Sequence, residues 1–325
     1  MTKIAIAGAG SIGCFVGGVL AKAGHDVCFL ARPRIVKAVA SEGLTLTDYE
    51  GLQAHLTGLE MTEDPSVLAQ ADIVLVCVKS AATAEIATEV AAHAPDHAIV
   101  VSLQNGVRNA DILRAALPNH DVRAGMVPFN VVPKGPTAFH RGTSGNILVE
   151  AGPLPDLSTK AVGWEQVSDI KGIQWGKLLI NLGNAINALS DLPLLQTLQD
   201  RAWRRLMADQ MSEALGIMKA NGITPAKTTA APPKLVPFIL RLPTPLFKRV
   251  AAQMLTIDAE ARSSMWDDLT QRRPTEVDAL QGEIIRLAEQ QNLQAPLNSR
   301  LRQLIKSAEA KGDGPPGLSV KDIRG

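Results

Sequence analysis

Apolar runs of strand length alternate with amphipathic segments along the first part of the chain. The runs that predict buried strands lie at residues 3–7, 25–31, 72–78, 98–102 and 122–127. Between them, apolar positions recur at helical spacing from about residue 12, over 82–92 and over 109–117. This alternation predicts a parallel sheet with helices on both faces. The segment 131–150 is richer in Gly, Pro and Thr, which predicts short antiparallel strands at the end of the domain.

A glycine-rich turn follows the first predicted strand. It reads Gly8-Ala9-Gly10-Ser11-Ile12-Gly13 and precedes a helix and a second strand. In this context Gly8 permits a tight turn, Gly10 lets the backbone approach a pyrophosphate, and Gly13 lets helix and strand pack closely. The helix that begins near Ile12 directs its N-terminal amides toward that phosphate. The motif therefore predicts a dinucleotide site, and a glycine-rich turn without a ligand is the alternative.

The end of the second predicted strand indicates which dinucleotide is bound. NAD enzymes usually carry Asp or Glu at this position, where the carboxylate holds the ribose 2′-hydroxyl. Here the chain reads Ala31-Arg32-Pro33-Arg34. A guanidinium group is well suited to a 2′-phosphate, because it is planar and donates paired hydrogen bonds. We therefore predict NADP(H) as the cofactor, with Arg32 on the phosphate. The alternative is a solvated pair of charges at a strand end.

The pattern changes near residue 168. From Gln174 onward apolar residues recur mostly at helical spacing, and no strand pattern follows. The sequence thus predicts an N-terminal Rossmann-type, doubly wound domain over residues 1–168 and an all-helical domain over 169–325. The tail from Gly312, which begins Gly-Asp-Gly-Pro-Pro-Gly, is expected to be flexible or loosely docked.

Composition argues against several classes of function. The net charge is +1 and aromatic residues make up 3%, so neither a basic footprint nor a stacking surface for nucleic acid is expected. The longest candidate for a membrane span, residues 235–255, contains three prolines and three basic residues. The three cysteines lie far apart without metal-ligand spacing, which predicts reduced thiols, no metal site and a cytoplasmic protein.

A polar stripe marks the most apolar helix of the second half, predicted over residues 175–189. Lys177, Asn181 and Asn184 stand at i, i+4 and i+7 and share one face, whereas Asn187 lies off that face. Buried Lys and Asn need polar partners, and a cleft that holds a polar ligand supplies them. Burial also lowers the pKa of a lysine toward neutrality, which suits a general acid. The alternative is an interhelical network with Lys177 reaching the surface.

The second half lacks several residue types that serve as catalytic acids or nucleophiles. All histidines precede residue 141, all cysteines precede residue 78, and the only tyrosine is Tyr49. A proton donor from the helical domain must therefore be Lys, Asp, Glu or water.

Two further segments carry candidate chemistry. Leu103-Gln104-Asn105-Gly106 follows a predicted strand, and Lys79 follows the neighbouring one, so both reach the sheet edge where doubly wound folds bind ligands. A simple Asn-Gly turn is an equally good interpretation of the first segment. Farther on, Pro274 fits the first position of a helix, with Glu276 in its first turn, where a capping role is the alternative to a catalytic one.

These motifs together resemble the ketopantoate reductase (2-dehydropantoate 2-reductase) family. The resemblance covers nearly the whole chain apart from residues 225–254 and the last dozen. The motifs that carry it are Gly8 to Gly13, Val78-Lys79, residues 103–106, Lys177 with Asn181, and Ser263-Ser264-Met265 followed by residues 275–278.

The resemblance implies NADPH-dependent reduction of a 2-oxo acid, with ketopantoate converted to pantoate for pantothenate biosynthesis. Lys177 would be the general acid, and Glu276 would hold that lysine or the substrate hydroxyl. Ser264 would bind the substrate carboxylate, and Asn181 and Asn184 its hydroxyl end. In the other domain, Lys79 and Asn105 would lie between the nicotinamide and the substrate.

Two departures from the family pattern concern substrate contacts. An Asn usually stands three residues before the serine that matches Ser264, and here Ala261 takes its place. The second Asn usually follows the lysine by eight residues, whereas Asn184 follows by seven. A different 2-oxo acid is therefore one alternative, and a protein that binds NADP(H) without turnover is another. The proline-rich segment 225–254 is expected to cover the cleft or to build a subunit contact, as in a homodimer.

Overall fold

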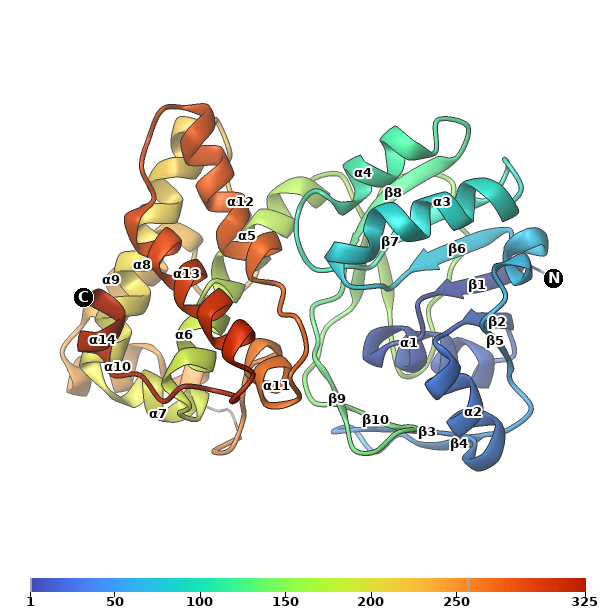
Figure 1. Ribbon diagram of the computed structural model, residues 1–325, viewed down its shortest axis with the longest axis horizontal. Helices are drawn as coiled ribbons and strands as arrows, with labels where there is room; N and C mark the ends of the chain where they lie inside the picture. Colours follow the sequence, from blue (N-terminus) through green and yellow to red (C-terminus); the bar gives the residue numbers. More distant parts are fainter. Residues whose placement is uncertain (1, 256–257) are drawn as a thin grey trace. The chain divides into compact units, whose positions relative to one another are not determined.

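The computed structural model describes residues 2–255 and 258–325, without the side chains of 253 and 254. The chain divides into two compact units, Met1–Ile170 and Lys171–Gly325 (Figure 1). The first is a mixed α/β unit and the second is helical, which confirms the predicted fold class.

The main sheet of the first unit has the strand order β12-β11-β8-β7-β6-β1-β2-β5. Its strands are β1 (Lys3–Ala7), β2 (Asp26–Leu30), β5 (Glu60–Thr62), β6 (Ile73–Val76), β7 (Ile99–Ser102), β8 (Asp121–Met126), β11 (Ile147–Glu150) and β12 (Trp164–Val167). From β5 to β8 all neighbours are parallel. The order reverses at β1, with β2 on one side and β6 on the other, and such a switch point is where doubly wound sheets bind ligands.

Helices cover both faces of this sheet (Figure 1). They are α1 (Ser11–Lys22), α2 (Pro33–Glu42), α3 (Thr83–His93) and α4 (Asn109–Ala116), with short turns η1 (Pro65–Gln70) and η2 (Ser80–Ala82). Successive residues of β1 point into different cores: Ile4 and Ile6 belong to one cluster, Ala5 and Ala7 to the other. Burial on both faces explains why the parallel strands read as unbroken apolar runs.

A second, four-stranded sheet of order β4-β3-β10-β9 was not predicted from the sequence. It consists of β3 (Leu44–Asp48), β4 (Gln53–Leu56), β9 (Val131–Pro133) and β10 (Ala138–Arg141). The expectation of antiparallel strands over 131–150 is correct for β9–β10 and for β11–β8. The expectation is wrong for β10 on its other side, where it pairs in parallel with β3. The local pattern could not reveal this pairing, because β3 lies about ninety residues earlier in the chain.

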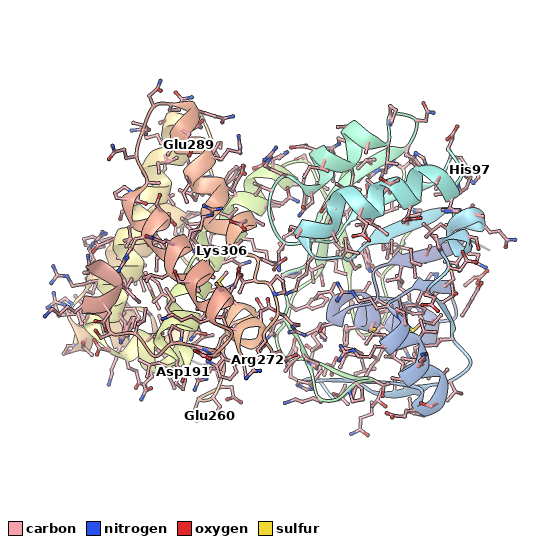
Figure 2. All side chains as sticks on the ribbon, viewed as in Figure 1. His97, Asp191, Glu260, Arg272, Glu289 and Lys306 are labelled. Carbon is pink, nitrogen blue, oxygen red and sulfur yellow. The ribbon has the colours of Figure 1, made fainter. Side chains whose placement is uncertain are left out.

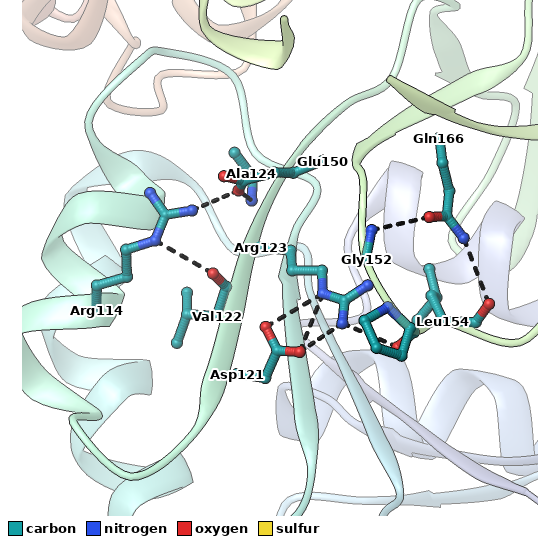
Figure 3. A network of polar contacts seen from close by, with 10 residues as sticks. Arg114, Asp121, Val122, Arg123, Ala124, Glu150, Gly152, Leu154 and Gln166 are labelled. Carbon is teal, nitrogen blue, oxygen red and sulfur yellow. Dashed lines mark hydrogen bonds and ion pairs between the residues drawn. The ribbon is translucent and has the colours of Figure 1, made fainter. Parts of the chain in front are cut away.

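A polar network joins α4 to the antiparallel strand pair β8–β11 of the main sheet (Figure 3). Arg114 on α4 pairs with Glu150 on β11, and Glu150 in turn accepts the backbone amide of Ala124 at 3.0 Å. Arg123, 3% exposed, pairs with Asp121 and donates to the carbonyl of Pro153 at 2.8 Å. The buried guanidinium is thus paired and hydrogen-bonded through Nε and Nη2, which offsets much of the cost of burying its charge.

The cysteines are Cys14, Cys28 and Cys77, and all are free thiols. Burial raises the pKa of Cys14 to about 12 and that of Cys28 to about 11, so these two groups stay protonated and unreactive at neutral pH.

The described residues of the second unit form helices and no strand. These are α5 (Ile170–Asn181), α6 (Gly183–Ser190), α7 (Leu194–Gln199), α8 (Arg201–Ala220), α9 (Val236–Arg241), α10 (Thr244–Val250), α11 (Ser264–Thr270), α12 (Val277–Gln290), α13 (Pro296–Lys311) and α14 (Val320–Arg324), with turns η3 (Pro233–Leu235) and η4 (Ala252–Leu255). The long helix α8 packs against α9, α12 and α13. Over the described residues, no helix is both long enough and apolar enough to cross a bilayer.

A buried arginine holds the proline-rich segment in place. The guanidinium of Arg204, on α8, donates to the carbonyls of Leu240 and Leu242 and to the hydroxyl of Thr244. It also lies 4.2 Å from the ring centroid of Phe247. The segment with α9 and α10 is therefore anchored to α8 by one fully buried side chain.

The C-terminal tail, expected to be flexible or loosely docked after Gly312, is docked in the structure. The amide of Leu318 donates to the carbonyl of Leu189 at 2.8 Å, and Ile323 is fully buried. Ser319 and Asp322 form a capping box that begins α14. Glycine and proline enrichment from Gly312 obscured these docking contacts, which follow the Gly-Pro run.

Candidate active site

The glycine loop follows β1 and leads directly into α1. Gly8 has φ +105°, and a Cβ there would lie 2.8 Å from the backbone nitrogen of Val78. The amides of Gly8 and Ala9 both donate to the carbonyl of Leu30, which ties the loop to the end of β2. Only glycine fits the first position of this turn, as the sequence motif predicts.

The next two glycines have opposite surroundings. A Cβ on Gly13 would lie 2.3 Å from the carbonyl oxygen of Gly8 and 3.2 Å from the Cβ of Cys77. A Cβ on Gly10, by contrast, would meet no atom within 4 Å. Gly10 is also the N-cap of α1, and no side chain caps that helix end. Open space beside uncapped helix amides fits the pyrophosphate of a dinucleotide.

We expect alanine at these two glycines to have separable effects. Gly13→Ala should lower the free energy of unfolding by about 1–3 kcal/mol, because its methyl group meets the backbone. Gly10→Ala should leave stability unchanged, since φ at Gly10 is −84° and the methyl group enters open space. Gly10→Ala should still weaken NADPH binding at least about tenfold, or by 1.4 kcal/mol. Chemical denaturation and cofactor titration measure the two effects. Unchanged NADPH affinity in Gly10→Ala would contradict the assignment of the loop.

Arg32 and Arg34 are both exposed. Arg32 comes two residues after β2 and is the N-cap of α2, and Pro33 takes the first helical position. The amide of Ala31 donates to the carbonyl of Thr62, so the backbone that carries Arg32 is fixed to the neighbouring strand end. Arg32 therefore stands at the carboxyl edge of the sheet, on the same side as the glycine loop.

Lys79 and Asn105 end neighbouring parallel strands. Lys79 is exposed and follows β6 by three residues, and Asn105 is half-buried and follows β7 by three residues. Since β6 and β7 pair in parallel, both residues lie at the carboxyl edge. The structure thus brings them to the edge that also carries the glycine loop.

A buried polar network fixes the loop that carries Asn105. Its carbonyl accepts hydrogen bonds from Ser80 Oγ at 2.7 Å and from Asn109 Nδ2 at 2.6 Å. Asn109 also accepts from Thr83, which in turn accepts from Gln104 at 2.8 Å. Sequence reasoning missed this network, although its polar residues precede or begin helices, as capping residues do. Four side chains therefore hold the loop more firmly than a simple Asn-Gly turn requires.

The polar stripe of the helical unit lies on two helices and not on one. Lys177 and Asn181 belong to α5, Asn184 belongs to α6, and all three are half-buried. Leu182 interrupts the predicted helix while keeping helical angles, φ −55° and ψ −32°. The single helix predicted over residues 175–189 is therefore wrong at this position.

Two remote glutamines contact the backbone where α5 ends and α6 begins. The carbonyl of Leu182 accepts hydrogen bonds from Gln281 Nε2 at 2.8 Å and from Gln210 Nε2 at 3.1 Å. Both glutamines are fully buried, on α12 and α8. These glutamines therefore tie the chain between Asn181 and Asn184 to α8 and α12.

The environment of Lys177 suits a proton donor. Burial lowers the pKa of its ammonium group to about 8, and the negative charge of Glu276 acts in the opposite direction. At neutral pH about nine in ten such groups remain protonated. Because the charge of Glu276 affects the pKa of Lys177, the two side chains lie close enough for their charges to interact.

Glu276 does not cap the helix that it precedes. It holds the N-cap position of α12, but its side chain makes no capping hydrogen bond. The helix begins at Val277, so the expectation that Pro274 takes the first helical position is wrong. Instead, Thr275 Oγ1 accepts the amide of Val277 at 3.2 Å. The carboxylate of Glu276 is thus not used for capping.

Ser264 is exposed and is the first residue of α11. Ser263 before it caps this helix by accepting the amide of Trp266 at 3.2 Å. Ala261, the position at which an asparagine was expected, accepts the amide of Leu194 at 2.9 Å through its carbonyl.

Asn187 has a structural role that sequence reasoning missed. Its side chain is fully buried, accepts the amide of Ser263 at 2.8 Å and donates to the carbonyl of Leu192 at 2.7 Å. It thereby fixes the backbone just before Ser264. The only sequence signal was its place off the polar stripe, on an otherwise apolar face of the helix.

A doubly wound sheet with a dinucleotide-type glycine loop, followed by a helical unit with a half-buried lysine, is typical of nucleotide-dependent oxidoreductases. The model of the family "Ketopantoate reductase PanE/ApbA" matches residues 4–153, and that of its C-terminal part matches residues 169–309. The chain belongs to the ketopantoate reductase family of oxidoreductases.

Individual relatives agree with this assignment. The 2-dehydropantoate 2-reductase of Halobacterium salinarum is 27% identical over 95% of this chain and its own full length. The crystal structure of a PanE/ApbA family ketopantoate reductase from Ralstonia eutropha has a TM-score of 0.82 at 30% identity, covering 96% of this chain and 99% of that one. D-mandelate dehydrogenase, solved with NADH and anilino(oxo)acetate, shares the fold at 18% identity with a TM-score of 0.79 over 96% and 100% of the two chains.

Proposed function

We propose that the chain reduces 2-dehydropantoate (ketopantoate) to pantoate with NADPH and uses Lys177 as the general acid. The observation that carries this proposal is the half-buried Lys177, with its pKa lowered to about 8 beside Glu276, in a chain of the ketopantoate reductase family. An acid with a pKa near the working pH is well matched to proton transfer. Synthesis of pantothenate in the cytoplasm is the proposed context.

The proposed cofactor is NADP(H). The amides of Gly8 to Gly13 and the N-terminus of α1 would hold the pyrophosphate, and Arg32 would bind the 2′-phosphate. Lys79 and Asn105, at the carboxyl edge of the same sheet, would contact the nicotinamide and the substrate. When bound, NADPH supplies the hydride that adds to C2 of the oxo acid.

The helical unit would supply the proton and bind the substrate. The ammonium group of Lys177 donates its proton to the carbonyl oxygen at C2, which becomes the hydroxyl of the product. Glu276 would stabilise the ammonium form of Lys177 or accept a hydrogen bond from the substrate hydroxyl. Ser264 would bind the carboxylate, and Asn181 and Asn184 would bind the hydroxyl end.

A different 2-oxo acid is the second candidate substrate. The methyl group of Ala261 replaces an amide that the family pattern places three residues before the serine. A missing hydrogen-bond donor weakens recognition of a substrate hydroxyl, because a site discriminates through such polar contacts. The substrate is then another branched or hydroxylated 2-oxo acid reduced by the same residues.

The test is NADPH oxidation at 340 nm with purified protein and a panel of 2-oxo acids that includes ketopantoate. NADH is run in parallel. Turnover with ketopantoate and NADPH supports the first candidate, and turnover only with another 2-oxo acid supports the second. NADPH binding without turnover across the panel would support the non-catalytic alternative.

We further propose that the chain forms a homodimer through α9 and α10. Leu235, Phe238, Leu246 and Val250 expose 51%, 66%, 47% and 54% of their surface, and all lie within the proline-rich segment. Clustered exposed apolar side chains are typical of interaction surfaces.

Phe238→Asp should therefore convert a dimer to a monomer, because it places a charge on the proposed apolar interface. Sedimentation velocity measures the outcome. Leu293→Asp is the matched control, since Leu293 is also exposed (43%) but lies outside the segment. A monomeric wild-type protein at micromolar concentration would contradict the proposal.

A further inference from the structure

The loop between α11 and α12 is attached to α13 at one point. Both the backbone amide and the hydroxyl of Thr275 donate to Oε1 of Glu309, at 2.8 Å and 2.6 Å. The same hydroxyl accepts the amide of Val277 at 3.2 Å, the first residue of α12. Glu276 stands between Thr275 and Val277, so the backbone on both of its sides is fixed by this one arrangement.

Glu309 is itself held in position. Its side chain is only 14% exposed, and Oε2 pairs with Lys306 at 2.7 Å (Lys306 is labelled in Figure 2). Burial alone would raise the pKa of Glu309, but the ion pair with Lys306 and the bonds from Thr275 lower it overall. Glu309 is therefore a carboxylate at neutral pH, able to accept both hydrogen bonds from Thr275.

Further ion pairs join the start of α12 to α13. Lys306 also contacts Asp278 at 3.3 Å, and Asp278 accepts from Arg302 Nε at 2.6 Å. Asp278 is the second residue of α12, two positions after Glu276. Exposed pairs of this kind contribute little to stability individually. Their shared effect is to hold one short loop, from Thr275 to Asp278, against one face of α13.

We propose that Glu309 is a positioning residue, which holds Thr275 so that the carboxylate of Glu276 faces Lys177. The inference rests on the proposed function only in taking Lys177 as the acid of the reaction. Glu309 belongs to a different helix from either residue, and the resemblance to known reductases assigned it no role.

The charges on these elements allow the direction of a change in the pKa of Lys177 to be predicted. The charged residues are Lys171 and Lys177 on α5, Asp267 and Asp268 on α11, Arg272 and Arg273 in the following turn, Asp278 on α12, and Arg302, Lys306 and Glu309 on α13. Of these and Glu276, the group whose charge raises the pKa of Lys177 is Glu276. If the loop moves and Glu276 turns away, the pKa of Lys177 must fall.

The experiment measures the titration of Lys177 without requiring turnover. Lysines are ¹³C-dimethylated, the Lys177 signal is assigned with Lys177→Arg, and its chemical shift is followed by NMR from pH 6 to 11. Glu309→Ala and Thr275→Val should each lower the pKa of Lys177 by about half a unit or more. Thr275→Ser, which keeps the hydroxyl, should titrate as the wild type does. In Glu309→Ala and Thr275→Val, the decrease of kcat at alkaline pH should also begin at a lower pH than in the wild type.

Lys311→Gln is the matched control, because it removes an exposed charge from the same helix α13 and leaves Glu309, Lys306 and the two bonds from Thr275 in place, so Lys177 should titrate as in the wild type. A wild-type titration in Glu309→Ala and Thr275→Val would overturn the proposal, even if both variants unfold at lower temperature. Should Glu309→Ala fail to fold, Thr275→Val against Thr275→Ser decides the question. A lowered pKa together with full activity of Lys177→Ala would support the positioning role and refute the proposed function.

Discussion

Lys177→Ala is expected to lower kcat by about 10²–10⁴-fold, the usual contribution of a positioned general acid. The second unit offers no histidine, cysteine or tyrosine to replace it. The dissociation constant for NADPH should stay unchanged, because the proposed cofactor contacts belong to the first unit. Stopped-flow or steady-state NADPH oxidation measures the first quantity, and fluorescence titration measures the second.

The control for this experiment is Lys219→Ala, which removes an exposed lysine at the end of α8. Wild-type kcat in Lys177→Ala would refute the assignment. The pH dependence gives a second test, since an acid acts in its protonated form. With the pKa of Lys177 lowered to about 8, kcat should be constant below pH 7 and fall as pH rises through 8. A rise of kcat over that pH range would contradict the assignment, because a lysine that acts as an acid loses its proton as the pH increases.

Arg32→Ala should lower kcat/KM for NADPH by about 10- to 100-fold and leave kcat/KM for NADH unchanged. Charge-assisted hydrogen bonds of this kind contribute about 1.5–3 kcal/mol, and only NADPH carries the 2′-phosphate that accepts them. Initial rates with both cofactors at saturating oxo acid measure the ratio of kcat/KM for NADPH to kcat/KM for NADH.

Arg34→Ala is the matched control for Arg32, because both residues are exposed and lie two positions apart. Its effect on the NADPH to NADH ratio should be smaller, since Arg34 lies within α2 and not at the strand end. An equal loss for both cofactors in Arg32→Ala would indicate a structural role for Arg32 and contradict phosphate recognition.

The sequence predicted the main sheet well because its strands are buried on both faces. The predicted run at residues 3–7 corresponds to β1, and the run at 98–102 to β7, within one residue. The strands β3 and β4 were not predicted, because their apolar and polar positions alternate over only four or five residues, as at Leu44 and Leu46. β3 also pairs with β10, which lies far along the chain, and short-range patterns carry no information on such pairing.

The candidate site was predictable at positions where the local backbone geometry accepts only one residue type. Gly8 and Gly13 are required by local geometry, and that requirement is visible in the spacing. The contacts of the Leu182 carbonyl, between α5 and α6, were not predictable, because their donors come from helices α8 and α12. Pro274 misled the assignment of the start of α12, because hydrogen bonds from Thr275 to distant Glu309 fix that loop instead.

The interrupted helix at Leu182 has a consequence for how the substrate range of such an enzyme can change. Lys177 and Asn181 precede Leu182 and Asn184 follows it, while the side chains that donate to the Leu182 carbonyl are Gln210 and Gln281, 28 and 99 positions away. We expect a substitution at either glutamine to shift the amide of Asn184 against the proposed acid while the side chains of the candidate site are retained. Divergence of specificity can therefore arise outside the pocket, and a comparison of pocket residues alone would overlook it.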